Sequence, residues 1–122
     1  MNDLTSRTCR PCEGGVEPLT AEQAGLLATQ LDASWSVGGK TLERRFSFAN
    51  FHDTMAFVNA VAWIAHQENH HPDLAVSYNR CVVTYQTHAI HGLSENDFIC
   101  AAKVDALLAP AADSPSCAVA ER

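Results

Sequence analysis

The stretch FHDTMAFVNAVAWIAHQE, residues 51–68, has the strongest periodicity in the chain. Its apolar residues recur at spacings of three and four, which places them on one face of a helix. They are Phe51, Met55, Val58, Ala62 and Ala65, with Val61 and Ile64 widening the stripe. The pattern predicts an amphipathic helix over residues 51–68. Pro72 disfavours helical backbone at the residue before it, so the helix is expected to end before residue 71.

The residues before this helix alternate between apolar and polar side chains. Leu42, Phe46 and Phe48 fall on one side of an extended chain, and the residues between them are mostly charged. This alternation predicts a half-buried strand over residues 40–49. A short strand around Trp35 and Val37 is expected to pair with it through the turn at residues 38–39. Further upstream, Thr20 and Gln23 form a capping-box pattern that predicts a helix over residues 20–32.

The residues after the long helix predict a second strand pair and a last helix. Leu74, Val76 and Tyr78 alternate as a strand, residues 79–80 suit a two-residue turn, and residues 81–87 are again rich in strand formers. Residues 90–92 are expected to form a loop. Ser94, with Asp97 three positions later, predicts the start of a helix that continues to about residue 108. The whole order predicts an α+β two-layer sandwich, with an antiparallel sheet of four strands and three helices on one face.

Length and composition limit the class of protein. The chain has 122 residues, enough for one domain, and a net charge of −6, which argues against a nucleic-acid partner. Its longest apolar run, residues 60–65, is too short to span a membrane, and the N-terminus lacks the apolar segment of a signal peptide. We therefore expect a cytoplasmic protein without a membrane partner. Residues 1–18 suggest an irregular arm, residues 19–109 the folded domain, and residues 110–122 a flexible tail.

The cysteines give no disulfide framework. An odd number with wide spacing suits a reducing compartment; they are Cys9, Cys12, Cys81, Cys100 and Cys117. The spacing of Cys9 and Cys12 is typical of zinc binding or thiol exchange. No second pair follows, and the motif lies in a segment rich in Pro and Gly, so a plain N-terminal arm is the favoured interpretation.

Four histidines gather around the end of the long helix and the last strand. His66 and His70 are four residues apart and are expected to share a helical face, with His71 just beyond and His88 returning beside them. Imidazoles facing one pocket suit general acid–base catalysis near neutral pH. A zinc site using His66, His70 and His88 fits the spacing almost equally well. A third explanation is that positive imidazoles simply suit a helix C-terminus.

The stretch HQENHHPDLAVSYNRCVVTYQTHAIHGLSENDF, residues 66–98, resembles the signature of the pterin-4a-carbinolamine dehydratases. Its matching positions are His70-His71-Pro72, Tyr78, Thr87-His88, Gly92-Leu93-Ser94 and Asp97. The cysteine motif near the N-terminus and the Arg-x-Phe-x-Phe at residues 44–48 are also similar to bacterial members. The resemblance covers about residues 9–108. It implies a four-stranded antiparallel sheet with three helices on one side, in a homodimer or homotetramer.

The resemblance also implies an activity and its residues. Family members dehydrate 4a-hydroxytetrahydropterin, the product of aromatic amino acid hydroxylases, to quinonoid dihydropterin, which recycles the pterin. It implies catalysis by His70 and His88 and no metal or other cofactor. The remaining implied site residues are His71, Pro72 and Thr87 for substrate binding, with His66, Tyr78 and Asp97 in support. Two positions depart from the family pattern: His66 replaces a common acidic residue, and residues 73–75 lack a common aromatic one.

The same fold also serves in proteins that bind rather than catalyse. Animal relatives act as dimerisation cofactors for a transcription factor, and related bacterial proteins act as assembly factors. The assembly relatives tend to lose catalytic histidines, whereas this chain keeps them. The resemblance therefore favours the enzyme and leaves a non-catalytic binding module as the alternative.

Overall fold

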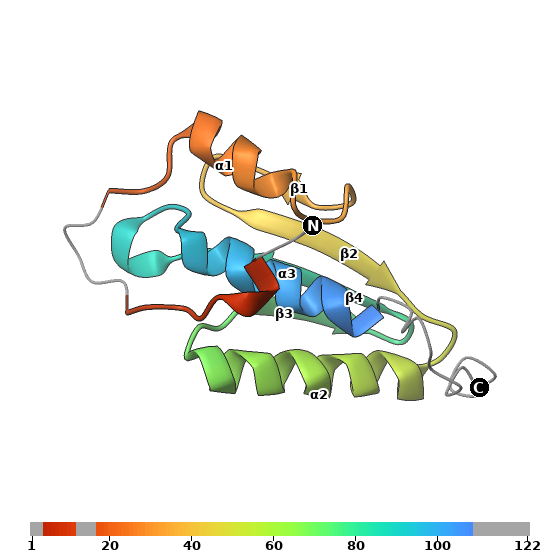
Figure 1. Ribbon diagram of the computed structural model, residues 1–122. Helices are drawn as coiled ribbons and strands as arrows, with labels where there is room; N and C mark the ends of the chain where they lie inside the picture. The colour runs from red at the N-terminus through yellow and green to blue at the C-terminus, as the bar shows by residue number, and fades with distance from the viewer. Residues whose placement is uncertain (1–3, 12–16, 109–122) are drawn as a thin grey trace.

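The computed structural model describes residues 4–11 and 17–108, and these form an open four-stranded antiparallel sheet with three α-helices (Figure 1). The predicted α+β fold is therefore confirmed. The elements in chain order are η1 (Leu4–Ser6), α1 (Ala21–Ala28), β1 (Ser36–Val37), β2 (Leu42–Ser47), α2 (Phe51–Glu68), β3 (Asp73–Ser77), β4 (Arg80–Tyr85), η2 (His88–Ile90) and α3 (Glu95–Leu108). No helix in these ranges is both long and apolar enough to cross a membrane.

The sheet has the strand order β1-β2-β4-β3, so β2 and β4 form its centre and β3 is an edge. The register pairs Leu42 with Tyr85 and Ser47 with Arg80. The turn between β3 and β4 lies at residues 78–79, one position before the predicted one. The shift follows from contacts outside the turn. The Thr54 hydroxyl donates to the carbonyl of Tyr78 at 3.0 Å, which holds this residue in the turn, and Arg80 already pairs with Ser77 in the sheet.

Helix α2 has the predicted length, and its buried face shares Val61, Ile64 and Ala65 with the predicted stripe but is shifted around the helix. Its N-cap is Asn50, whose side chain accepts from the amide of Asp53 at 2.7 Å. The buried residues are Thr54, Phe57, Val61, Ile64 and Ala65. The predicted face was wrong at Phe51, which is 50% exposed, and at Ala62, which is also exposed. The cause is the packing of Phe57 against Phe46 of β2 and Phe48 just beyond it, with ring centroids 4.6 Å and 5.1 Å from that of Phe57.

The other two helices begin at the predicted caps. The capping box of Thr20 and Gln23 is present, but α1 ends at Ala28 rather than near residue 32. Helix α3 lies across the sheet and is its most deeply buried helix, with eight buried residues between Asn96 and Val104. At its start the Asp97 carboxylate accepts from the amide of Ser94 at 3.0 Å, the reciprocal half of the predicted cap.

The N-terminal segment contributes to the core. Leu4 is fully buried among the core residues, and η1 packs against α3 (Figure 1). Residues 17–19 also lie close to the domain, since a Cβ atom at Gly92 would come within 2.7 Å of the Pro18 side chain. The part of the predicted arm that the structure describes is therefore packed onto the domain. Cys12, Cys117 and the predicted tail lie outside the described residues.

Candidate active site

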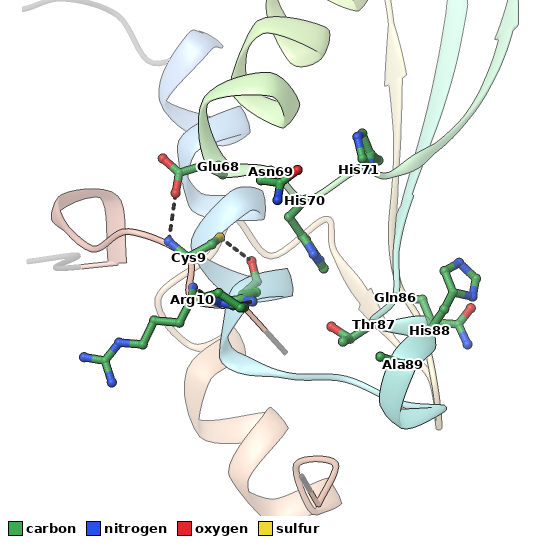
Figure 2. A pocket seen from close by; sticks show the side chains of 12 residues that line it. Cys9, Arg10, Glu68, Asn69, His70, His71, Gln86, Thr87, His88 and Ala89 are labelled. Carbon is green, nitrogen blue, oxygen red and sulfur yellow. Dashed lines mark hydrogen bonds between the residues drawn. The ribbon is translucent and has the colours of Figure 1, made fainter. Parts of the chain in front are cut away.

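A pocket of about 390 Å³ opens where the end of α2, the end of β4, the start of α3 and the N-terminal segment meet (Figure 2). It is lined by Cys9, Arg10, Pro11, Glu68, Asn69, His70, His71, Gln86, Thr87, His88, Ala89 and Asn96. The pocket thus brings together three of the predicted histidines, together with polar groups from both ends of the chain.

His70 is placed by the way α2 ends. Asn69 adopts the left-handed conformation with φ 54°, which terminates the helix and turns His70 out of its spiral. The imidazole Nε2 lies 2.6 Å from Oδ1 of Asp97, and the ring stacks on Tyr85 with centroids 6.0 Å apart. A carboxylate accepts but cannot donate, so this hydrogen bond places the imidazole proton on Nε2. The lone pair of a neutral His70 is then on Nδ1.

Asp97 is the most constrained charged group of the site. Its side chain is fully buried, and Oδ2 accepts from the Thr87 hydroxyl at 2.8 Å as well as from the amide of Ser94 at 3.0 Å. Because the Thr87 hydroxyl donates to Asp97, it accepts from Ser94, whose hydroxyl oxygen lies 2.7 Å away. These bonds satisfy the buried carboxylate and fix its orientation toward His70. Thr87 therefore supports Asp97 from inside the protein.

His71 and His88 reach the pocket from two loops. Both side chains are exposed, in contrast to that of His70, whose exposed fraction is 13%. The amide of Thr87 donates to the carbonyl of Gly92 at 2.9 Å and closes the loop that carries His88. Figure 2 shows His71 on the segment that leads into β3 and His88 at the start of η2, with the His70 side chain directed toward Thr87. The site therefore combines one fixed imidazole with two that solvent and a ligand can reach.

Two predicted supporting residues lie away from the pocket. His66 is exposed on α2, and its ring packs against Trp63 at 5.6 Å. The predicted shared face of His66 and His70 was wrong, because the helix ends at Glu68 before reaching His70. Tyr78 is 63% exposed at the far end of β3, where it stacks on Phe51 at 6.3 Å. Pro72, predicted to bind substrate, is half-buried and does not line the pocket.

The sequence did not indicate the wall formed by the N-terminal segment. The amide of Cys9 donates to Glu68 at 2.8 Å, and the amide of Arg10 donates to the side chain of Asn96 at 3.0 Å. Glu68 also forms an ion pair with Lys103 at 3.5 Å. The cysteine motif was the one local signal in this segment. Nothing in its spacing shows that this segment packs against α3, more than 80 positions later in the sequence.

Tyr85 forms the apolar base beneath His70. Burial raises the pKa of its phenol, so the ring stays neutral against the imidazole. Within the described ranges its hydroxyl oxygen is buried and has no hydrogen-bond partner. The ring therefore acts as a flat support for His70 rather than as a proton donor to it.

The three histidines of the alternative zinc site are not gathered. His66 lies outside the pocket that holds His70 and His88. Among the described residues, no group of three or more His, Cys, Asp or Glu side chains is arranged to hold a metal ion.

Fold and site together define a small α+β protein with a histidine-lined pocket. The sequence profile described as "Pterin 4 alpha carbinolamine dehydratase" matches residues 17–107. The chain belongs to this family. Similar proteins carry provisional names as pterin-4-alpha-carbinolamine dehydratases. One from Nitrosomonas eutropha is 62% identical over 106 residues, covering 87% of this chain and 94% of the relative. Another, from Legionella pneumophila strain Corby, is 55% identical over 109 residues, covering 88% and 96%.

Two solved structures share the fold. The crystal structure of a transcriptional coactivator/pterin dehydratase from Brucella melitensis superposes with a TM-score of 0.71 at 30% identity, covering 76% of this chain and 100% of that one. A pterin dehydratase-like protein identified as a RuBisCO assembly factor in the alpha-carboxysome gives a TM-score of 0.55 at 28% identity, covering 64% and 93%. The fold is thus found in proteins described by different roles.

Proposed function

We propose that this protein is a hydro-lyase that dehydrates 4a-hydroxytetrahydropterin to quinonoid dihydropterin and water. The observation that carries the proposal is the pocket lined by His70, His71 and His88, with His70 fixed by the fully buried Asp97. The family membership supplies the substrate class.

The reaction requires two proton transfers on neighbouring atoms. A base removes the N5 proton, the electron pair forms the C4a–N5 double bond, and the C4a–O bond breaks as an acid protonates the leaving hydroxyl. No oxidation state changes, so the proposed mechanism uses no redox cofactor. Each transfer needs a side chain that can gain or lose a proton near neutral pH, and histidine is the usual choice.

His70 suits the role of base. Its Nε2–H is held by Asp97, which leaves the Nδ1 lone pair to accept the N5 proton. The imidazolium that forms is then stabilised by the adjacent carboxylate, as in other carboxylate–histidine pairs. His88, on the exposed loop, is placed in the role of acid toward the 4a hydroxyl. His71 binds and orients the pterin between them.

The proposal extends to the setting of the enzyme. The substrate is the form that aromatic amino acid hydroxylases release, so the protein would recycle their pterin in the cytoplasm.

We also propose a homo-oligomer, supported by the β3 edge strand and by exposed apolar side chains at Phe51, Trp63 and Tyr78. Light scattering coupled to size-exclusion chromatography tests this point, and a monomer at micromolar concentration would contradict it.

The alternative is a binding module, as in the RuBisCO assembly factor of related fold. The two are separated by a stopped-flow absorbance assay on freshly generated 4a-hydroxytetrahydropterin. We expect the wild-type protein to accelerate the loss of substrate above the spontaneous rate. His52→Ala, which changes an exposed histidine outside the pocket, is the matched control and should retain the rate. A folded wild-type protein that gives only the spontaneous rate would favour the binding module.

A further inference from the structure

Two cysteines from opposite ends of the chain meet beside the pocket. Cys9 lies on the N-terminal segment and Cys100 on α3, 91 positions apart in sequence, yet their Sγ atoms are 3.5 Å apart. Cys9 is half-buried and lines the pocket, whereas Cys100 is fully buried behind it. The proposed dehydration uses neither thiol, so the pair is unexplained by the function above.

The backbone around the pair is held in place by hydrogen bonds on both sides. The amide of Cys9 donates to Glu68 at 2.8 Å (Figure 2). Asn96 accepts from the amide of Arg10 at 3.0 Å, and its side-chain nitrogen donates back to the Arg10 carbonyl. Asn96 and Cys100 are four residues apart and share one face of α3, so this face contacts the N-terminal segment at two points. The thiols are therefore held near each other by the fold itself.

We propose that Cys9 and Cys100 form a redox-modifiable dithiol that a peroxide converts into a disulfide, which ties the N-terminal wall of the pocket to α3. Bond formation requires the sulfur atoms to approach by about 1.5 Å, from contact to bonding distance. Residues 7–11, which carry Cys9, lie in neither a helix nor a strand, so they are the part that moves.

The two thiols have different roles in this step. Cys9 is reachable from the pocket, so its sulfur attacks the peroxide: an S–O bond forms, the O–O bond breaks, and the leaving oxygen takes up the thiol proton and departs as water. The sulfur of Cys100 then attacks the sulfenic acid of Cys9, the S–S bond forms and a second water leaves. Two thiols are oxidised by two electrons, and hydrogen peroxide is reduced to two waters. The hydrogen bond with Cys9, followed by burial, raises the pKa of the Cys100 thiol. Cys100 thus keeps its thiol proton until it attacks the sulfenic acid, and this proton then leaves with the hydroxyl group as the second water.

The test uses the full chain with Cys12 and Cys117 replaced by serine, so that the described cysteines alone remain. The protein is treated with hydrogen peroxide and digested without reduction, and the peptides are mapped by mass. We expect a linked peptide containing Cys9 and Cys100. We also expect the Tm to rise by roughly 10 °C, because the bond closes a very long loop, and to return on addition of dithiothreitol.

Single replacements in this background identify the pair. Cys9→Ser and Cys100→Ser should each lose both the linked peptide and the rise in Tm. Cys81→Ser removes another buried thiol and is the matched control that should keep both. The proposal is overturned if the folded background protein gives no such peptide, or if Cys9 is oxidised to sulfinic acid while Cys100 stays reduced. It is also overturned if the unmodified chain links Cys9 to Cys12 instead.

Discussion

Replacing Asp97 by asparagine should separate the catalytic role of this residue from its structural role. The fully buried carboxylate accepts three hydrogen bonds, from His70 at 2.6 Å, from Thr87 at 2.8 Å and from the amide of Ser94 at 3.0 Å. In Asp97→Asn the amide oxygen can keep the bonds to Thr87 and Ser94. Its nitrogen then faces His70 and must donate, so Nε2 becomes an acceptor and the imidazole proton moves to Nδ1.

The substitution should lower the free energy of unfolding and slow dehydration strongly. Three charge-assisted hydrogen bonds become neutral ones, each weaker by about 1 kcal/mol, so the free energy of unfolding should fall by about 3 kcal/mol. The moved proton occupies the Nδ1 lone pair that takes the substrate proton. Dehydration should therefore slow by at least about 100-fold, the contribution of one general base. Asp97→Ala also leaves Thr87 and Ser94 without a buried acceptor, and should cost about 4–6 kcal/mol.

Both quantities are accessible in the same preparation. Urea unfolding followed by tryptophan fluorescence gives the free energy, and stopped-flow absorbance gives the rate on a sample shown to be folded. The reasoning would be refuted by an Asp97→Asn protein that is folded and dehydrates the pterin at nearly the wild-type rate. The structural half would be refuted if Asp97→Ala were as stable as Asp97→Asn.

Three further outcomes follow from the buried polar groups of the domain. Tyr85→Phe removes a buried hydroxyl that has no partner among the described residues, so urea unfolding should show a gain of about 1 kcal/mol; a loss would mean that the hydroxyl is bonded. Asp105→Ala removes the acceptor of the Trp35 indole at 2.7 Å and should cost about 2–3 kcal/mol while the dehydration rate is kept; an unchanged urea midpoint would contradict this. Burial raises the pKa of Cys81, and the Cys9 hydrogen bond and burial raise that of Cys100, so the folded chain keeps thiol protons that the unfolded chain loses. Stability in reducing buffer should then fall above about pH 9, by roughly 1.4 kcal/mol per pH unit for each thiol, and a flat profile would count against it.

Local patterns predicted the elements well where the responsible contacts are local. The capping box of Thr20 and Gln23 depends on residues three apart and was confirmed. The start of α3 also follows from its own sequence, with Asp97 turned back to the amide of Ser94. These contacts form within one turn of the chain, so a single sequence contains the information needed to place them.

Features set by distant contacts could not be predicted in the same way. The stripe on α2 was assigned to a face that includes Phe51, but packing against Phe46 and Phe48 shifts the buried face to one that contains Phe57. His66 and His70 have helical spacing, and the left-handed conformation of Asn69 separates them. Cys9 shows no local sign of its contact with α3. In each case the deciding partner lies outside the window in which periodicity is read.

The most direct test of the central claim, that His70 and His88 act as base and acid on one pterin, is the dehydration rate of the two single alanine variants and the double variant. Stopped-flow absorbance on fresh 4a-hydroxytetrahydropterin gives all three against the spontaneous reaction. Each single variant should lose at least about 100-fold and remain folded, and the double variant should fall to the spontaneous rate. Single variants that stay within about threefold of the wild-type rate would contradict the claim.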